Sequence, residues 1–355
     1  MAPKTYPQGT LISSYTGHGS QPDVEVIVWS SDGRYIASQS YDIRGQDKPT
    51  NLEEYNKLLC VHIWEADTGK LVSTYDEPYL DKVKTLAWSP DGRRIALGYH
   101  SLWSAAVLVC DTRVVKNPFS LLKKQTLVQF LGGSTQSISY KVSSLAWSPD
   151  GKYIASGGED HILHVWEATS GKILSAYKSN NGMAVYRVVW LPDGNIKIVT
   201  GGQDDAYIVD VTSGHEILCQ ASVSNMFYAT ECFALSRDGR YFASAENSST
   251  YTDEIKQGVY PWLVRVWDAA SGKVLFSGEK HTNFVRTVSL SPDSKYLASG
   301  SVDKTIRIWR LETGENVFTY RGHTNEINTL SWSPDSKRIA SSSLWENRIH
   351  IWQAT

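Results

Sequence analysis

The hydrophobic residues of this chain fall in short runs in which apolar and polar positions alternate. In the stretch 285–309, Val285–Leu290 leads to a Ser-Pro-Asp turn, Tyr296–Ser299 follows, and a tight turn leads into Thr305–Trp309. Runs of β-branched and aromatic residues of this length, bounded by Pro, Asp, Ser and Gly, indicate strands joined by turns. The pattern therefore predicts an all-β fold.

The same unit recurs seven times along the chain. The aspartates of its turn are Asp32, Asp91, Asp150, Asp193, Asp238, Asp293 and Asp335, which lie 42 to 59 residues apart. Its third strand ends at Trp64, Cys110, Trp166, Val209, Trp267, Trp309 and Trp352, and a fourth strand follows. Four strands per repeat of roughly 45 residues are typical of a β-propeller blade. We therefore expect one domain over residues 1–355, a seven-bladed β-propeller of four-stranded antiparallel blades.

The two ends of the chain are expected to meet in one blade. Residues 10–16 have the pattern of a fourth strand, whereas the last repeat ends near Trp352 without one. We expect residues 10–16 to supply the outer strand of the last blade and so to close the ring. Insertions are expected at 40–58, 113–124 and 246–261. Loops longer than a fold requires are often functional.

Several motifs resemble those of the WD-repeat β-propeller family. They are the Gly-His pairs ending at His18 and His323, the Ser-Pro-Asp turns, and Trp267-Asp268. The turns also resemble the repeats of bacterial multidomain proteins. The resemblance covers nearly the whole chain and implies a non-catalytic scaffold that binds proteins or peptides. It implies that binding uses the top face, where the connections between blades and those between second and third strands lie.

One recurring set of side chains could suggest a hydrolase. His281, Ser299 and Asp303 are the residue types of a catalytic triad. The resemblance implies instead a structural network that runs from Asp to His to Ser to Trp309. Partial copies favour this interpretation, because a triad would not be repeated piecemeal. The copies are Ser156, Asp160 and Trp166 without a His, and His323, Ser341 and Trp352 with Glu346 in place of Asp. Blades two, four and five lack most of the set.

The resemblance also implies which positions contact a partner on the top face. They are Asp23, Lys82, Trp103, Lys141, Phe227, Tyr260, Phe284, Glu326 and Trp345. Large aromatic residues are favoured where a few side chains supply most of the binding energy. Two interpretations of the aromatic residues stay open, a binding rim and a cover for the ends of neighbouring blades. The mixed charges fit a protein ligand better than a polyanion.

Charge and residue composition argue against several classes of partner. The net charge of −2 gives no general attraction to nucleic acid or acidic membranes, and the sequence has no run of about 18 apolar residues. The four cysteines match no zinc-site spacing, and we expect them to be buried thiols in a reducing, cytoplasmic compartment. His62, His164 and His350 share one register before the third-strand position, which favours packing over metal binding. We expect no cofactor, no nucleic acid and no membrane partner.

The rival hypothesis is a propeller enzyme, or a binder of small molecules or metals, that uses the central funnel. It requires acidic or histidine residues from several blades at the top positions, and only Asp23, Glu159 and Glu326 qualify. The sequence leaves open whether the chain is a complete protein or part of a larger multidomain protein or complex.

Overall fold

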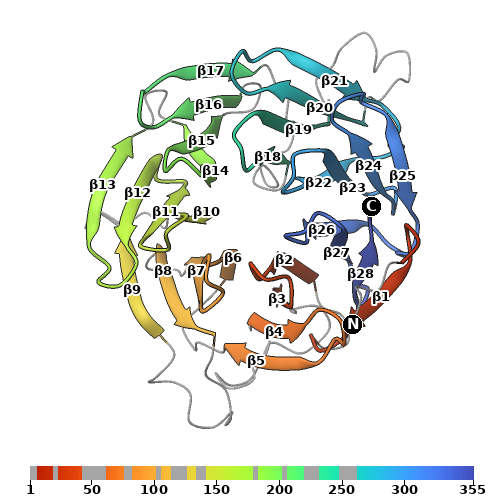
Figure 1. Ribbon diagram of the computed structural model, residues 1–355, viewed down its shortest axis with the longest axis horizontal. Coiled ribbons are helices and arrows are strands. Elements are labelled where there is room, and N and C mark those ends of the chain that lie inside the picture. Colours follow the sequence, from red (N-terminus) through yellow and green to blue (C-terminus); the bar gives the residue numbers. More distant parts are fainter. Residues whose placement is uncertain are drawn as a thin grey trace, which may run out of the picture.

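The computed structural model describes residues 6–18, 23–41, 61–75, 82–100, 105–112, 126–132, 141–178, 183–201, 206–219, 232–247 and 262–355. They form seven four-stranded antiparallel sheets arranged in a ring (Figure 1). The prediction of an all-β, seven-bladed propeller is confirmed. Within these residues there is no helix that is long and apolar enough to cross a membrane.

Each blade runs outward from the central axis. The innermost strands are β2 (Asp23–Trp29), β6 (Lys82–Trp88), β10 (Val142–Trp147), β14 (Ala184–Trp190), β18 (Phe233–Leu235), β22 (Val285–Leu290) and β26 (Ile327–Trp332). The second strands are β3 (Tyr35–Tyr41), β7 (Arg94–His100), β11 (Tyr153–Gly158), β15 (Ile196–Gly201), β19 (Tyr241–Asn247), β23 (Tyr296–Ser301) and β27 (Arg338–Ser343).

The outer half of each blade has the same regularity. The third strands are β4 (Val61–Glu65), β8 (Ala105–Asp111), β12 (Ile162–Glu167), β16 (Ala206–Asp210), β20 (Trp262–Asp268), β24 (Ile306–Arg310) and β28 (Ile349–Gln353). The outermost strands are β5 (Leu71–Tyr75), β9 (Thr126–Gly132), β13 (Ile173–Lys178), β17 (Glu216–Cys219), β21 (Val274–Gly278), β25 (Asn316–Tyr320) and, for the last blade, β1 (Leu11–Tyr15).

Two of the predicted insertions begin later than expected. β3 continues through Tyr41 and β19 through Asn247, so residues 40 and 246 belong to strands. Each of these second strands has seven residues, one more than β23 and β27 of the compact blades six and seven. The remainder of these two insertions, and the whole of 113–124, lie outside the described residues.

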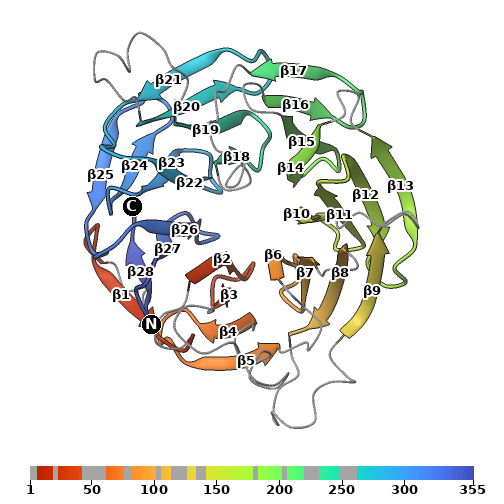
Figure 2. The ribbon, with the colours of Figure 1, turned by 180° about the vertical axis from the view of Figure 1, so that it is seen from behind.

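The chain closes the ring as predicted. β1 pairs antiparallel with β28, with Leu11 opposite Trp352 and Tyr15 opposite Ile349. Figures 1 and 2 show β1 beside β28, although the two strands come from opposite ends of the chain. Because β1 covers the outer edge of β28, that edge is not left as a template for pairing with another chain.

The core lies between blades and not within them. Each sheet packs against both neighbours, so apolar residues on both of its faces are buried, among them Trp64, Trp309 and Trp352. Cys110 takes the tryptophan position in the second blade, and both Cys110 and Cys232 are buried. Cys60 lies outside the described residues, and the cytoplasmic location stays a prediction.

The end of β1 also packs against the first blade. The ring of Tyr15 stacks on that of Trp64, with centroids 4.7 Å apart and an angle of 6° between the planes. Tyr320, at the end of β25, stacks in the same way on Trp352 in the next blade, at 4.2 Å and 4°. The first strand of the chain therefore completes the last blade through its backbone and the first blade through a side chain.

We predict that deletion of residues 1–16 makes the protein aggregate and lowers its melting temperature. The deletion exposes the edge of β28 and removes the tyrosine that covers Trp64, so both neighbouring blades lose packing. Size-exclusion chromatography and thermal unfolding would measure the effect. A monodisperse truncated protein with unchanged melting would show that β1 does not close the ring.

Candidate functional site

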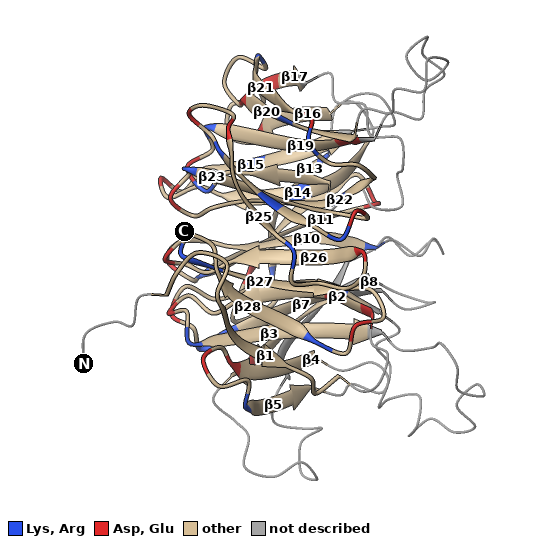
Figure 3. Ribbon diagram, turned by 90° about the vertical axis from the view of Figure 1, so that its right-hand side faces the viewer, with Lys and Arg blue, Asp and Glu red and all other residues tan. Residues whose placement is uncertain are grey.

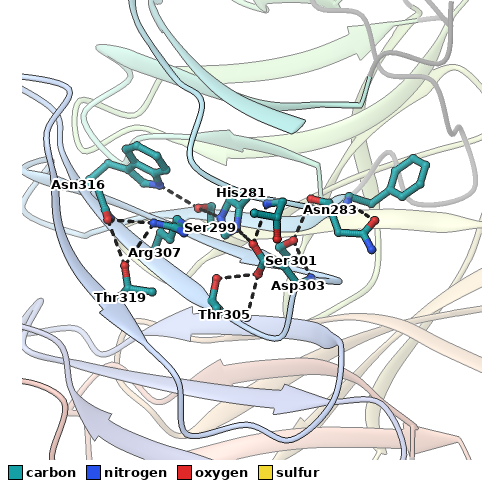
Figure 4. Close-up of polar contacts among 12 residues, drawn as sticks. His281, Asn283, Ser299, Ser301, Asp303, Thr305, Arg307, Asn316 and Thr319 are labelled. Atoms are coloured by element: carbon teal, nitrogen blue, oxygen red, sulfur yellow. Dashed lines mark hydrogen bonds and ion pairs between the residues drawn. The ribbon is translucent and has the colours of Figure 1, made fainter. Parts of the chain in front are cut away.

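The sixth blade contains a buried chain of hydrogen bonds from Asp303 to Trp309 (Figure 4). His281 Nδ1 lies 2.8 Å from Asp303 Oδ2, and His281 Nε2 lies 2.8 Å from Ser299 Oγ. The indole N–H of Trp309 donates to the same hydroxyl oxygen at 2.8 Å. Burial would raise the pKa of Asp303, but the hydrogen bond and charge of His281 outweigh it and lower that pKa. The network satisfies polar groups that are buried together.

This geometry does not suit nucleophilic attack. Ser299 is fully buried, and its hydroxyl oxygen lies between the imidazole and the indole. A triad serine must present its oxygen to a substrate carbonyl. The three residue types of a hydrolase therefore serve here to connect the strands of one blade.

Blades seven and one repeat the network with other residues in place of the aspartate. His323 lies 2.6 Å from Glu346 and 2.8 Å from Ser341, which accepts the Trp352 indole N–H at 3.1 Å. In the first blade, His18 lies 2.7 Å from Ser38, and Ser40 takes the acidic position at 2.9 Å. The sequence analysis missed this copy, because a serine replaces the carboxylate. The Gly17-His18 pair was the available signal.

Blades three and five contain part of the network. In the third blade His164 of β12 lies 3.1 Å from Asp160, so this histidine contacts the acid. Trp166 donates to Ser156 at 2.7 Å. Blade five retains the serine–tryptophan bond, in which the indole N–H of Trp267 donates to the hydroxyl oxygen of Ser244 at 3.1 Å. Beside it, burial raises the pKa of Glu246 to about 7, although Arg265 opposes the shift.

A second histidine packs on the first in blades one and seven. His62 stacks on His18 and His350 on His323, each with ring centroids 4.2 Å apart. The outer partner in each pair also meets a tyrosine hydroxyl from the preceding blade, with 2.6 Å between His62 Nδ1 and the Tyr15 oxygen. Burial lowers the pKa of His62 to about 4. The shared register predicted from sequence therefore corresponds to contacts across a blade seam in these two blades.

One of these clusters has metal-ligand chemistry. Ligand atoms of His323, Glu346 and His350 lie within 4.8 Å of one another. Burial would raise the pKa of Glu346, but hydrogen bonds from His323 and Ser343 lower it to about 2. Both ring nitrogens of His323 are already hydrogen-bonded, so a metal ion would have to replace at least one of these bonds. The cluster has the contacts of a structural network.

The top-face residues fall into two groups, those that the structure describes and those outside it. Trp103, Phe227 and Tyr260 lie outside the described residues. Asp23 begins β2 and Lys82 begins β6. Lys141 is exposed and its Nζ lies 3.2 Å from Glu159 Oε1. Phe284, Glu326 and Trp345 remain, and all three lie on blades six and seven.

These last three residues form a connected rim. Phe284 packs against Trp262 of the fifth blade, with ring centroids 4.2 Å apart. Arg286, two residues on, bridges to Glu326 with 2.6 Å between Nη2 and Oε2. The backbone carbonyl of Glu326 accepts the N–H of Leu344, the residue before Trp345. The rim therefore runs without a break from the start of β20 to the turn after β27.

The bridge depends on a β-bulge that sequence analysis did not predict. The inner strands of six blades shift register at the same place, and the bulged residues are Glu25, Lys84, Ser143, Tyr186, Arg286 and Asn328. Bulges redirect a side chain without ending the strand. Lys84 reaches Glu25 of the preceding blade at 3.1 Å, as Arg286 reaches the following one. Two of the three acids on which the funnel-enzyme hypothesis depends are ion-paired, Glu326 with Arg286 and Glu159 with Lys141.

The opposite mouth of the channel contains a cavity that sequence analysis also missed. It has a volume of about 630 Å³ and is lined by five tryptophans at the ends of inner strands and by five turn prolines. Figure 3 shows basic and acidic residues interspersed along the turns on this side. The five tryptophans stand at the same position in their repeats, two residues before a Pro or Ser of the turn, and such equal positions in neighbouring blades imply that they meet around the axis.

Comparisons with known proteins agree with this architecture. Four segments of the chain match the WD domain, G-beta repeat family, at residues 9–42, 125–167, 272–310 and 314–353. These segments contain the inner strands of blades one, three, six and seven, in which a histidine joins the serine–tryptophan network or contacts its acid. The matches and the relatives below support a place in the WD-repeat family.

Three relatives illustrate the similarity. Cell division cycle 20.1, cofactor of APC complex, from Arabidopsis thaliana is 24% identical over 69% of this chain and 58% of its own length. WD repeat-containing protein slp1 from Schizosaccharomyces pombe is 28% identical over 40% of this chain and 34% of its own. Protein HIR1 from Eremothecium gossypii is 27% identical over 61% of this chain and 28% of its own. The chain thus spans less than two thirds of each relative. All three are eukaryotic, and the bacterial style of the turns stays a prediction.

We predict that the protein loses stability as the pH falls from 6.5 to 4, and that His62→Gln reduces this loss. Folded His62 stays neutral down to a pKa of about 4, whereas in the unfolded chain it takes up a proton below 6.5. Unfolding therefore binds a proton in this window, which corresponds to roughly 3 kcal/mol at pH 4. Urea unfolding at pH 7 and pH 4.5 would measure the difference. Identical pH slopes for the two proteins would contradict the prediction.

Proposed function

We propose that this propeller is a non-catalytic scaffold that binds a protein or peptide on its top face, at the rim formed by blades six and seven. The observation that carries the proposal is the conformation of Trp345. Its side chain is 49% exposed, and its backbone has a φ of +57°. A bulky L-residue in this left-handed region is strained. Strain combined with an exposed indole is typical of a functional position.

The chemistry of the rim suits a protein partner. Phe284 is 40% exposed and packs on Trp262, so two aromatic rings lie on one side of the rim and the 49% exposed Trp345 lies on the other. The ion pair between Arg286 and Glu326 lies between them. Large aromatic anchors flanking charged groups are the usual composition of binding hot spots in protein interfaces.

The ring provides the rigidity that such a site needs. The blade-six network and the antiparallel ladders fix the turns that carry Phe284 and Trp345. A partner therefore meets loops that are already ordered, and little loop entropy is lost on binding. The Arabidopsis relative is named as a cofactor of a protein complex, which supports a protein as the partner class. Cytoplasmic location, absence of nucleic-acid or membrane partners, and a place in a larger assembly are parts of this proposal.

We predict that Phe284→Ala combined with Trp345→Ala abolishes capture of a partner from a lysate of the source organism. Both substitutions remove apolar surface from the rim, and each large anchor contributes about 2 kcal/mol or more to binding. Affinity capture followed by mass spectrometry, and a binding titration with the purified partner, would measure the loss.

A matched control tests whether the rim itself is responsible. Ile173 and Leu174 of β13 are similarly exposed, at 46% and 48%, but lie on the outer strand of the third blade. Ile173→Ala combined with Leu174→Ala should leave capture unchanged, and both variants should melt like the wild type. Equal capture by all three proteins would refute the location of the site.

We predict that Trp345→Asn raises the free energy of unfolding by about 1 kcal/mol while it weakens partner binding. Asparagine tolerates the left-handed conformation, so the substitution relieves backbone strain. Chemical denaturation and the same binding titration would measure the two effects. A destabilised variant would show that the indole at this position supports the fold.

A further inference from the structure

The cavity on the opposite mouth of the channel has the size and walls of a ligand site. Its volume of about 630 Å³ lies within the usual range for such sites, roughly 300–1,000 Å³. The walls are the rings of Trp29, Trp88, Trp147, Trp190 and Trp332, together with one proline from each of five turns. The site is distinct from the top-face rim, because it lies where the inner strands end and the rim lies where they begin.

Three of the tryptophans are pinned by bonds between blades. Trp29 donates its indole N–H to the carbonyl of Ser331 at 3.1 Å, and Trp332 donates to that of Ser289 at 3.0 Å. Trp147 donates in the same way to Ala87 at 2.9 Å. Each acceptor belongs to the inner strand of the preceding blade, whose edge faces the channel. The indoles therefore cap carbonyl groups that the edge would otherwise leave open.

Trp88 departs from this pattern. The same geometry would pair its indole with the carbonyl of Val28, but its Nε1 is buried without a hydrogen-bond partner. A buried donor with no acceptor is costly, and a ligand that supplies an acceptor would recover that cost. The fifth tryptophan, Trp190, donates to the Gly194 carbonyl of its own turn at 2.9 Å. Because no bond fixes the nitrogen of Trp88, its ring can turn the N–H toward the cavity at less cost than its four bonded counterparts.

The seam beside Trp88 also differs in its turn. Between blades seven and one, and between blades two and three, a turn proline packs against the glycine of the turn in the next blade. Pro334 Cδ lies 3.6 Å from a Cβ position built on Gly33, and Pro90 Cδ lies 3.7 Å from one built on Gly151. At the seam between blades one and two, Ser31 replaces the proline, and its hydroxyl lies 3.3 Å from the Cβ position of Gly92. Ser31 is exposed and lines the cavity. A second hydrogen-bonding group therefore lies at the seam of the unpartnered indole.

The charged groups around the cavity argue against a cationic ligand. Arg94 lies over the ring of Trp147 with its guanidinium carbon 4.8 Å from the centroid, and Arg338 lies over Trp29 at 4.9 Å. The one charged side chain among the described lining residues is Arg237. The aromatic faces of Trp147 and Trp29 already have an arginine over them, and the described lining contains no carboxylate that would neutralise a cationic ligand.

We propose that this cavity binds a proline-rich peptide segment of a partner in the extended polyproline II conformation. The lining offers donors, at Trp88, Ser31 and Arg237, and its side chains include no carboxylate or amide acceptor. A prolyl segment matches this surface, because each residue contributes a carbonyl acceptor and no N–H that would be buried unpaired. Its preformed backbone loses little entropy, and its apolar rings suit aromatic walls.

The experiment uses the full chain and a fluorescently labelled, acetylated and amidated octaproline as the probe. Fluorescence anisotropy should show saturable binding, and an eight-residue Gly-Ser peptide should not bind. Trp88→Phe keeps the ring but removes the donor, and Ser31→Pro installs the residue found at this turn position in five other blades. We expect each substitution to weaken binding of the octaproline about tenfold, as loss of one buried hydrogen bond implies.

Two controls make the result decisive. Both variants should melt at or above the wild-type temperature, and Phe284→Ala, on the opposite mouth, should bind octaproline with unchanged affinity. Weakening in either cavity variant with an unchanged Phe284→Ala control supports the proposal. Absence of saturable binding, equal binding of the Gly-Ser peptide, or unchanged affinity in both cavity variants overturns it. Because capture through the top face is measured separately, failure here leaves the proposed function intact.

Discussion

No blade of this protein can bury its own apolar surface, and the rest of the structure depends on that constraint. A four-stranded sheet has two faces, and here both are covered by neighbouring sheets. Stability therefore lies in the seams between blades, and it is complete only if the ring closes. The chain meets this condition with five residues, Leu11–Tyr15, which complete the last blade by pairing and the first blade by stacking Tyr15 on Trp64.

The same position at the interfaces between blades is filled by different residues in different blades. Where a buried Trp ends the third strand in blades one and seven, a tyrosine of the preceding blade stacks on it. At the sixth blade the equivalent residue is Gly278, where an added Cβ would lie 2.6 Å from the ring of Trp309. The His–Ser–Trp network then connects the strands inside the blade. The inner strands of the three blades that contain the full His–Ser–Trp network, one, six and seven, all lie inside segments matched by the family model.

The sequence was sufficient to predict the ring because each repeat consists of residues with strong preferences for turn or strand conformations. Ser-Pro-Asp turns, alternating strands and the displaced first strand together determine seven blades and their closure. Side-chain contacts inside a blade were harder to predict. Ser40 replaces a carboxylate beside His18, and His164 contacts Asp160 four residues earlier. Both contacts depend on how the side chains of paired strands and their turns face one another, which the motif pattern alone does not give.

The candidate sites show the same division. The family pattern located Phe284, Glu326 and Trp345, but it did not predict the bulge that directs Arg286 to Glu326 or the left-handed backbone at Trp345. Both are backbone features that arise from pairing and not from composition. The cavity at the other mouth requires knowledge of which tryptophan nitrogens are bonded, and repeated sequence hides the difference between Trp88 and its counterparts.

The closure of the ring has a mechanical consequence. Thr10 and Gly9 exchange backbone bonds with Gln353, so the outer ends of β1 and β28 lie together at one end of their shared ladder. Tension applied between the two ends of the chain would act on this pair first and would peel it rung by rung, from Leu11 toward Tyr15. An antiparallel pair loaded in this way resists one rung at a time, whereas a pair loaded lengthwise shares the force among all its bonds. Under tension the propeller would therefore open at its seventh blade, with six blades still folded.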